Sequence, residues 1–207
     1  ERIRFLTSYP MGVSERLIEA MARLDKVCEQ ISLPVQAGDD EILWVMRRGY
    51  TIGQYRELIL EIRATIPGVA ISTDVIVGFP GENEEQFNRT RASLREARFD
   101  TVHAACYSPR PGTIASRKFP DDVPADVKKR RLKAVERLQE GIAGAINAGL
   151  LGKAVEVLVE GQSKGKWWGR TRTNKLVFFS DESDRFGQLV DVKIERTSPW
   201  SLQGEVA

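Results

Sequence analysis

The sequence is poor in the residues that build disulfide and metal sites. Its 207 residues include two cysteines, Cys28 and Cys106, and one histidine, His103. Two widely separated cysteines argue against a disulfide framework and suit a reducing cytosol. They are also too few for an iron–sulfur cluster, which takes about three or four thiolates. A single histidine excludes a multi-histidine metal site in this sequence, and we interpret all three side chains as packed residues.

Long apolar runs are missing as well. Nothing resembles a transmembrane span, a signal peptide or a lipidation motif, so we expect a cytoplasmic protein with no membrane partner. With 42% hydrophobic residues, the chain can bury the core of one large or two smaller domains. It starts at Glu1 without a methionine, and residues 2–6 already have a strand pattern. We therefore expect a fragment that begins inside a domain.

Basic residues are concentrated locally, although the net charge is only +2. Residues 162–175 contain five basic and no acidic side chains. A basic patch on a nearly neutral protein indicates a polyanionic partner for that part of the chain.

Strand and helix patterns alternate through the first half. Apolar, β-branched runs predict strands at residues 3–7, 30–35, 69–77 and 101–107. Apolar residues at helical spacing predict a helix after each of four N-capping residues, Ser14, Asp39, Thr51 and Asn83. This alternation predicts parallel strands joined by right-handed crossovers.

The pattern changes after Pro124. Residues 126–150 are predicted to form one long helix, and short strands are predicted at 154–160, 176–180, 188–195 and 201–206. Several short strands in so few residues indicate a small barrel, of the oligonucleotide-binding type. The predicted organisation is an α/β unit over residues 1–149 and an all-β unit over residues 150–207.

The most informative segment is the strand and loop at residues 69–82. The glycines let the backbone turn sharply at the carboxyl end of the strand, where parallel α/β proteins place their sites. Asp74 interrupts an apolar strand, so we expect a buried carboxylate paired with an arginine or bound to a ligand. The predicted site loop consists of Gly78, Phe79, Pro80, Gly81 and Glu82. An ordinary connecting loop remains the alternative.

Three other strand ends carry polar or glycine–proline loops, at residues 7–10, 34–38 and 107–113. They should share one face with the loop at 78–82. Gln36 offers an amide that can read a ribose or an adenine edge. Arg110, between two prolines, can present its guanidinium to a carboxylate or phosphate, although an ordinary ion pair is equally open.

Cations and aromatic residues interleave in the basic patch, a mixture suited to phosphate contact and base stacking. The predicted RNA-binding residues are Lys164, Lys166, Trp168, Arg170, Arg172 and Lys175. The alternative is a solvated hairpin whose aromatics pack the barrel. Adjacent Trp167 and Trp168 should point to opposite faces.

Several of these segments together resemble the carboxyl-terminal part of the radical S-adenosylmethionine methylthiotransferases. LPVQAGDDEILWVMRRGYT (33–51), TDVIVGFPGENEEQF (73–87) and YSPRPGT (107–113) are similar to strands and loops of that family's (β/α) barrel. Residues 123–138 resemble its connecting helix, and residues 150–207 its RNA-binding TRAM domain. WGRTRTNKLVFF (168–179) is similar to the type that modifies tRNA adenosine.

The resemblance implies a fold and a reaction. The fold is a partial (β/α) radical SAM barrel followed by an OB-like TRAM barrel. The reaction is methylthiolation at carbon 2 of N6-isopentenyladenosine-37 in the tRNA anticodon stem-loop, through a 5′-deoxyadenosyl radical. A second S-adenosylmethionine supplies the methyl group. Gln36, Asp74, Arg110 and the loop 78–82 would bind S-adenosylmethionine, and the basic patch would bind tRNA.

One departure from the family is large. Its C-x-x-x-C-x-x-C loop and a second set of three cysteines, which hold two [4Fe-4S] clusters, are not in this sequence. The cluster ligands are therefore expected outside this chain, together with an electron donor, and the fragment alone should be inactive. Two alternatives remain: a methylthiotransferase acting on a ribosomal protein side chain, and a non-catalytic RNA-binding module. The glycine–proline strand ends argue against the second.

Overall fold

The computed structural model describes residues 1–6 and 9–207. Its helices are η1 (Pro10–Gly12, a 3-10 turn), α1 (Glu15–Arg23), α2 (Asp40–Val45), α3 (Ile52–Thr65), α4 (Glu84–Ala97), α5 (Ile114–Lys118) and α6 (Ala125–Ala148). Its strands are β1 (Gln30–Ser32), β2 (Ala70–Val77), β3 (Thr101–Cys106), β4 (Ala154–Ser163), β5 (Lys166–Thr171), β6 (Leu176–Ser180), β7 (Leu189–Thr197) and β8 (Leu202–Val206).

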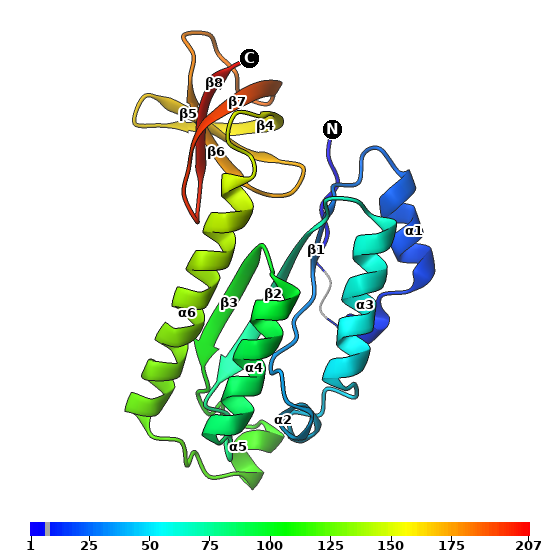
Figure 1. Ribbon diagram of the computed structural model, residues 1–207, viewed down its shortest axis with the longest axis vertical. Helices are drawn as coiled ribbons and strands as arrows, with labels where there is room; N and C mark the ends of the chain where they lie inside the picture. Colours follow the sequence, from blue (N-terminus) through cyan, green and yellow to red (C-terminus); the bar gives the residue numbers. More distant parts are fainter. Residues whose placement is uncertain (7–8) are drawn as a thin grey trace.

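The first unit is a parallel sheet covered by helices on one face. Within the described residues the sheet has the order β1-β2-β3, and both pairings are parallel, as predicted. Alternate residues of β2 divide between the two faces: Ile71 and Val75 are buried under the helices, whereas Ser72 and Asp74 are only partly buried. Helix α6 runs along β3 (Figure 1). The sheet therefore has one apolar, packed face and one polar, open face.

The predicted helix starts are confirmed. Ser14, Asp39, Thr51 and Asn83 each accept a hydrogen bond from a backbone N–H of the first turn, and Thr51 and Asn83 form full capping boxes. The short helix α5 was not predicted. It begins because the Thr113 hydroxyl accepts the Ser116 N–H at 3.2 Å.

The prediction of a strand over residues 3–7 was wrong for the described residues. Ile3 makes a single parallel bridge with Val27, which is too little neighbouring strand to extend the pairing. Thr7 and Ser8, part of the predicted loop at 7–10, lie outside the described residues. Strand β1 is also shorter than predicted, although the chain rejoins β2 through a bridge between Gln36 and Val75.

The second unit is the predicted small barrel. Its five strands close in the order β4-β5-β6-β8-β7. Val157, Phe179 and Leu202 fill its centre. The sequence did not indicate β5 as a separate strand, because KWWGRT is too polar for a core strand. Its alternation is nevertheless as expected: Trp167 is 8% exposed in the core, whereas Trp168 lies on the outer face.

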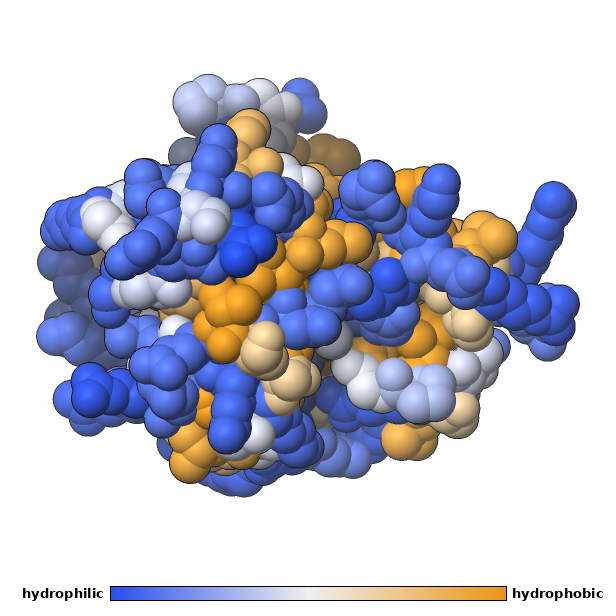
Figure 2. Space-filling view, turned by 90° about the horizontal axis from the view of Figure 1, so that it is seen from above, coloured by the Kyte–Doolittle hydropathy of each residue, from blue (hydrophilic) through white to orange (hydrophobic). Residues whose placement is uncertain are grey.

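The barrel lies at the amino ends of the sheet strands, and α2 and α5 lie at the other end (Figure 1). Arg172 of the barrel pairs with Glu29, just before β1, and Lys175 pairs with Asp100, just before β3, with closest N–O distances of 2.7 Å in both cases. Figure 2, seen from the barrel end, shows a largely hydrophilic surface with apolar patches near its middle. The two ion pairs make the junction between the two units polar.

Candidate functional site

Three predicted strand ends meet at the carboxyl edge of the sheet. They line a hollow of about 520 Å³ that includes Gln36 after β1, Ile76 and Phe79 at the end of β2, and Thr113 after β3. Arg48, which the sequence did not single out, also lines this hollow. The edge thus combines an amide, an aromatic ring and a guanidinium around one space.

Gln36 lines this hollow and has an unusual backbone conformation. Its φ of 71° lies in the left-handed region, which residues other than glycine seldom adopt. The conformation is fixed because the Gln36 N–H donates to the Asp74 carbonyl at 2.8 Å and the Gln36 carbonyl accepts the Ile76 N–H at 2.9 Å. Strain held in this way is typical of functional loops.

The glycine loop after β2 is held from inside the protein. Gly78 has a φ of 71°, and a Cβ there would overlap the aliphatic stem of Lys128. Glu82 Oε2 accepts the Gly78 N–H at 2.6 Å and an Arg131 N–H at 2.9 Å, and the Glu82 side chain is 1% exposed. Burial raises the pKa of Glu82, and the Gly78 and Arg131 interactions oppose that shift. Glu82 therefore supports the loop and does not reach the hollow.

The other loop residues have different positions. The buried Phe79 ring packs edge-on against Tyr107 at 5.0 Å, and Pro80 is buried beside it. The Gly81 N–H donates to Asp122 at 2.8 Å on the exposed side of the loop. Arg110 is exposed in the turn before α5 and makes no ion pair with any described residue. Only Phe79 among these lines the hollow.

The open face of the sheet carries Asp74 and His103 as direct neighbours in the β2–β3 register. Two expectations are corrected here. Asp74 is partly exposed and has no ion pair within residues 1–6 and 9–207, and His103 is exposed. Both side chains leave the core because helices cover the opposite face of the strands. They line a hollow of about 630 Å³ that extends to Gln36 and Asn174.

The predicted RNA-binding residues divide into two groups. Lys166, Trp168 and Arg170 alternate along β5 on its outer face, and Lys164 lies in the exposed turn before it. Arg170 pairs with Glu160 at 3.6 Å and donates to the Asn174 carbonyl at 3.1 Å, but its side chain remains 36% exposed. The second group, Arg172 and Lys175, faces the sheet.

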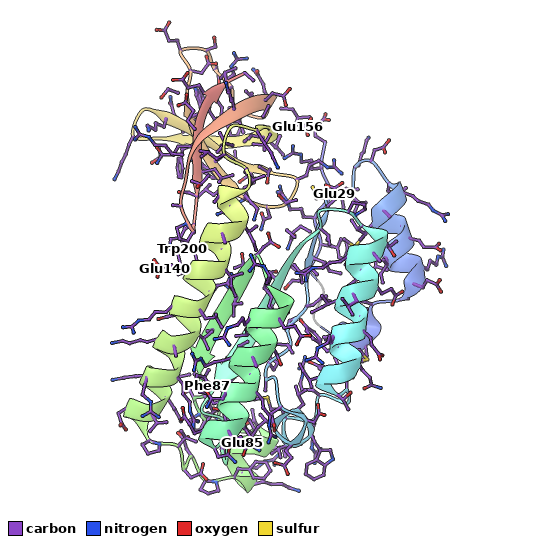
Figure 3. All side chains as sticks on the ribbon, viewed as in Figure 1. Glu29, Glu85, Phe87, Glu140, Glu156 and Trp200 are labelled. Carbon is purple, nitrogen blue, oxygen red and sulfur yellow. The ribbon has the colours of Figure 1, made fainter. Side chains whose placement is uncertain are left out.

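The cations of the second group are engaged inside the protein. Arg172 donates to both Glu29 oxygens and to the Asp25 and Val27 carbonyls, and Lys175 binds Asp100. Figure 3 shows Glu29 and Glu156 on the two sides of this junction. Glu156 accepts a hydrogen bond of 2.6 Å from Arg2. Arg172 and Lys175 therefore connect the two units and do not form part of a free basic surface.

Residues 1–94 match the Radical SAM superfamily, and residues 150–207 match the TRAM domain. The predicted resemblance is confirmed. The chain is 55% identical over 205 residues to "tRNA-2-methylthio-N(6)-dimethylallyladenosine synthase" of Dehalococcoides mccartyi, covering 99% of this chain and 49% of that protein. It is 54% identical over 206 residues to the protein of the same name in Chloroflexus aurantiacus, covering 98% and 44%. Residues 1–94 of the chain thus belong to the Radical SAM superfamily, and residues 150–207 form a TRAM domain.

This radical SAM–TRAM chain spans about half the length of the curated relatives it matches. A solved structure of archaeal Elp3 from Methanocaldococcus infernus aligns over 92% of this chain and 56% of its own, with 16% identity and a TM-score of 0.42. No described helix has the length and apolar character needed to cross a membrane.

The radical SAM family implies S-adenosylmethionine and an iron–sulfur cluster. The cluster does not fit this chain: the described residues contain no group of three or more His, Cys, Asp or Glu that could hold a metal. Cys28 is fully buried, and Cys106 packs against the core. The adenosyl part of S-adenosylmethionine does fit, because the carboxyl-edge hollow offers the Gln36 amide and an aromatic wall.

Proposed function

We propose that the protein containing this chain methylthiolates carbon 2 of N6-isopentenyladenosine-37 in tRNA, in the cytoplasm. One observation carries the proposal: a single hollow reaches from the TRAM barrel to the carboxyl edge of the sheet. Asn174 of the barrel and Gln36 of the edge line the same hollow, together with Asp74 and His103. This hollow would connect an RNA held on the barrel to the loops that would bind the cofactor.

The carboxyl edge is the proposed cofactor site. Gln36 would contact the adenosyl ribose or base, and Phe79 would form the apolar wall against it. Gly78, Pro80 and Gly81 shape the loop, and Glu82 fixes it through Arg131. Asp74 would face the cofactor's ammonium group from the open face of the sheet. The exposed Arg110 would lie at the outer rim of the cofactor site.

S-adenosylmethionine would supply the methyl group and the means of activating an unreactive carbon–hydrogen bond. In this proposal, the chain binds and orients the cofactor and the RNA. The two clusters and the contact with an electron donor belong to other parts of the protein. We therefore propose that residues 1–207 alone do not turn over.

The anticodon stem-loop is the proposed substrate region. The outer face of β5 presents Lys166, Trp168 and Arg170 with Lys164 at its end, which suits phosphate contact and base stacking. Arg172 and Lys175 are left out of this surface, because they face the sheet and pair there with Glu29 and Asp100.

Nucleoside mass spectrometry of bulk tRNA tests the function. Cells with the intact gene should contain the 2-methylthio adenosine derivative, and cells without it should accumulate the unmethylthiolated precursor. An unchanged nucleoside profile would refute the tRNA reaction. Mass spectrometry of ribosomal proteins from the same cells would then test the alternative substrate.

A further inference from the structure

A second hollow, of about 490 Å³, lies where the barrel meets the sheet. Trp200, in the hairpin between β7 and β8, lines it and remains 60% exposed. Figure 3 shows Trp200 beside α6, at the edge of the barrel. Neither the proposed cofactor site nor the β5 surface uses this side chain, although an exposed tryptophan in contact with a polar hollow is unusual for a packing residue.

The hairpin that carries Trp200 is fixed in place. The Asn147 side chain, on α6, is 5% exposed as a residue and donates to the Ser198 carbonyl at 2.8 Å and to the Pro199 carbonyl at 3.2 Å. Ser198 Oγ accepts N–H bonds from Trp200 at 3.3 Å and from Ser201 at 2.9 Å. The indole is therefore presented from a preorganised loop, so a ligand that stacks on it loses little loop entropy.

The walls around the indole have the chemistry of a nucleobase site. Arg170 and Asn174 line the barrel side of the hollow, and His103 lines the sheet side. An amide and a guanidinium can hydrogen-bond base edges or phosphate, while the indole offers a stacking face. A protein partner would favour an apolar hollow, whereas this one is mainly polar.

The hollow is also continuous with the open face of the sheet. Gln30, Ser72, His103 and Asn174 line both it and the hollow that contains Asp74 and Gln36. Arg170 connects it in turn to the outer face of β5. Trp200 thus lies at the point where an RNA leaving the barrel would enter the sheet.

We propose that Trp200 is a stacking platform for one unpaired nucleobase of the RNA, with Arg170 and Asn174 contacting that nucleotide. The inference rests on the proposed tRNA substrate and adds that the RNA is single-stranded at this point. It places the unpaired loop over the junction and the paired stem on the barrel side.

The test is RNA binding by the 207-residue chain, with a single-stranded anticodon-loop oligonucleotide and a fully paired duplex as probes. Trp200→Ala should weaken single-strand binding by about 5- to 150-fold, the usual effect of losing one base stack, and should leave duplex binding unchanged. Trp200→Phe should recover most of the affinity. The matched control is Phe186→Ala, which removes another aromatic that is 67% exposed on the barrel but does not line the hollow.

The outcomes separate this inference from the proposed function. If wild type binds RNA and Trp200→Ala loses no more affinity than Phe186→Ala, the stacking site is refuted, and Trp200 becomes a candidate for protein contact. If the wild-type chain binds neither probe, the proposal that it binds tRNA is itself refuted. Thermal melting of each variant, expected to match wild type because both side chains are exposed, excludes misfolding as the cause.

Discussion

Arg172 and Glu29 are 143 positions apart in the chain, yet they share three hydrogen bonds of 2.7–3.1 Å between guanidinium and carboxylate. Arg172 Nη1 and Nη2 also donate to the Asp25 and Val27 carbonyls. One barrel side chain therefore binds the whole turn before β1. Together with Lys175–Asp100 and Arg2–Glu156, this contact holds the barrel on the sheet.

Removing this contact should loosen the barrel without unfolding it. Arg172→Ala should weaken the docking of the barrel on the sheet by about 1.5–3 kcal/mol, the range for hydrogen bonds to charged groups. Hydrogen exchange should then rise at residues 25–29 and 170–175 and stay unchanged in β6 and β8. Arg196→Ala, which removes a barrel arginine with no ion pair among the described residues, is the matched control. Equal exchange in both variants would contradict the assignment.

The same contact should depend on pH. The Arg172 hydrogen bonds hold the pKa of Glu29 below its usual value, so its contribution is full above about pH 4.3 and is lost as the pH falls through the lowered pKa. Small-angle scattering between pH 7 and pH 3 should show the two units separating in that acidic window. Glu29→Gln should remove this transition, and an identical profile in wild type and Glu29→Gln would count against it.

The buried pair of Glu82 and Arg131 should be costly to break from one side. Arg131→Met leaves the 1%-exposed carboxylate of Glu82 without its cation, so we expect a loss of about 3–5 kcal/mol in the free energy of unfolding. Arg130→Met is the control, because that side chain is 66% exposed and should change stability by less than about 0.5 kcal/mol. Adding Glu82→Gln to Arg131→Met should restore part of the loss. Urea denaturation measures all three variants.

The Gly78 position should tolerate alanine less well than another glycine with the same backbone. Gly68 has a φ of 72° and open space where a Cβ would stand, whereas at Gly78 a Cβ would overlap Lys128. Gly68→Ala should cost about 1–2 kcal/mol from backbone strain alone. Gly78→Ala should cost more, because Lys128 must also move. Equal denaturation midpoints for the two variants would show that the Lys128 contact is unimportant.

The basic outer face of β5 should act through phosphate contacts. Lys166→Ala should weaken tRNA binding and reduce the slope of log affinity against log salt by about 0.7–0.9, the value for one phosphate contact. Lys193→Ala, an exposed lysine on β7 of the same barrel, should leave the slope unchanged. A slope that falls equally in both variants would indicate a diffuse charge effect and not the proposed surface.

The local signals in this sequence were sufficient for much of the fold. Ser14, Asp39, Thr51 and Asn83 cap helices as expected, because a capping residue depends only on the few residues after it. The parallel order and the barrel also followed from short-range patterns. The strand predicted at residues 3–7 is absent from the described residues 3–6, because strand pairing needs a neighbouring strand and the sequence does not say how much of one is present.

The candidate site was less predictable for the same reason. Asp74 and His103 were expected in the core because strand residues were assumed to be covered on both faces, but the helices cover only one. Arg172 and Lys175 are cations of the same basic segment as Lys166, so the sequence does not distinguish them. Only the fold brings Glu29 and Asp100 next to them. Trp200 and Arg48 gave no signal, since a single aromatic or cation in a loop is ordinary.

The position of the barrel at the amino ends of the strands has a geometric consequence. Strand β2 is eight residues long, so the junction and the carboxyl edge are separated by roughly 26 Å along the sheet. The sheet therefore sets a fixed distance between these two places. For the proposed RNA substrate, a nucleotide held at the junction would determine which other nucleotide of the same RNA reaches the edge. The spacing between the two nucleotides would then select the substrate, in addition to base identity.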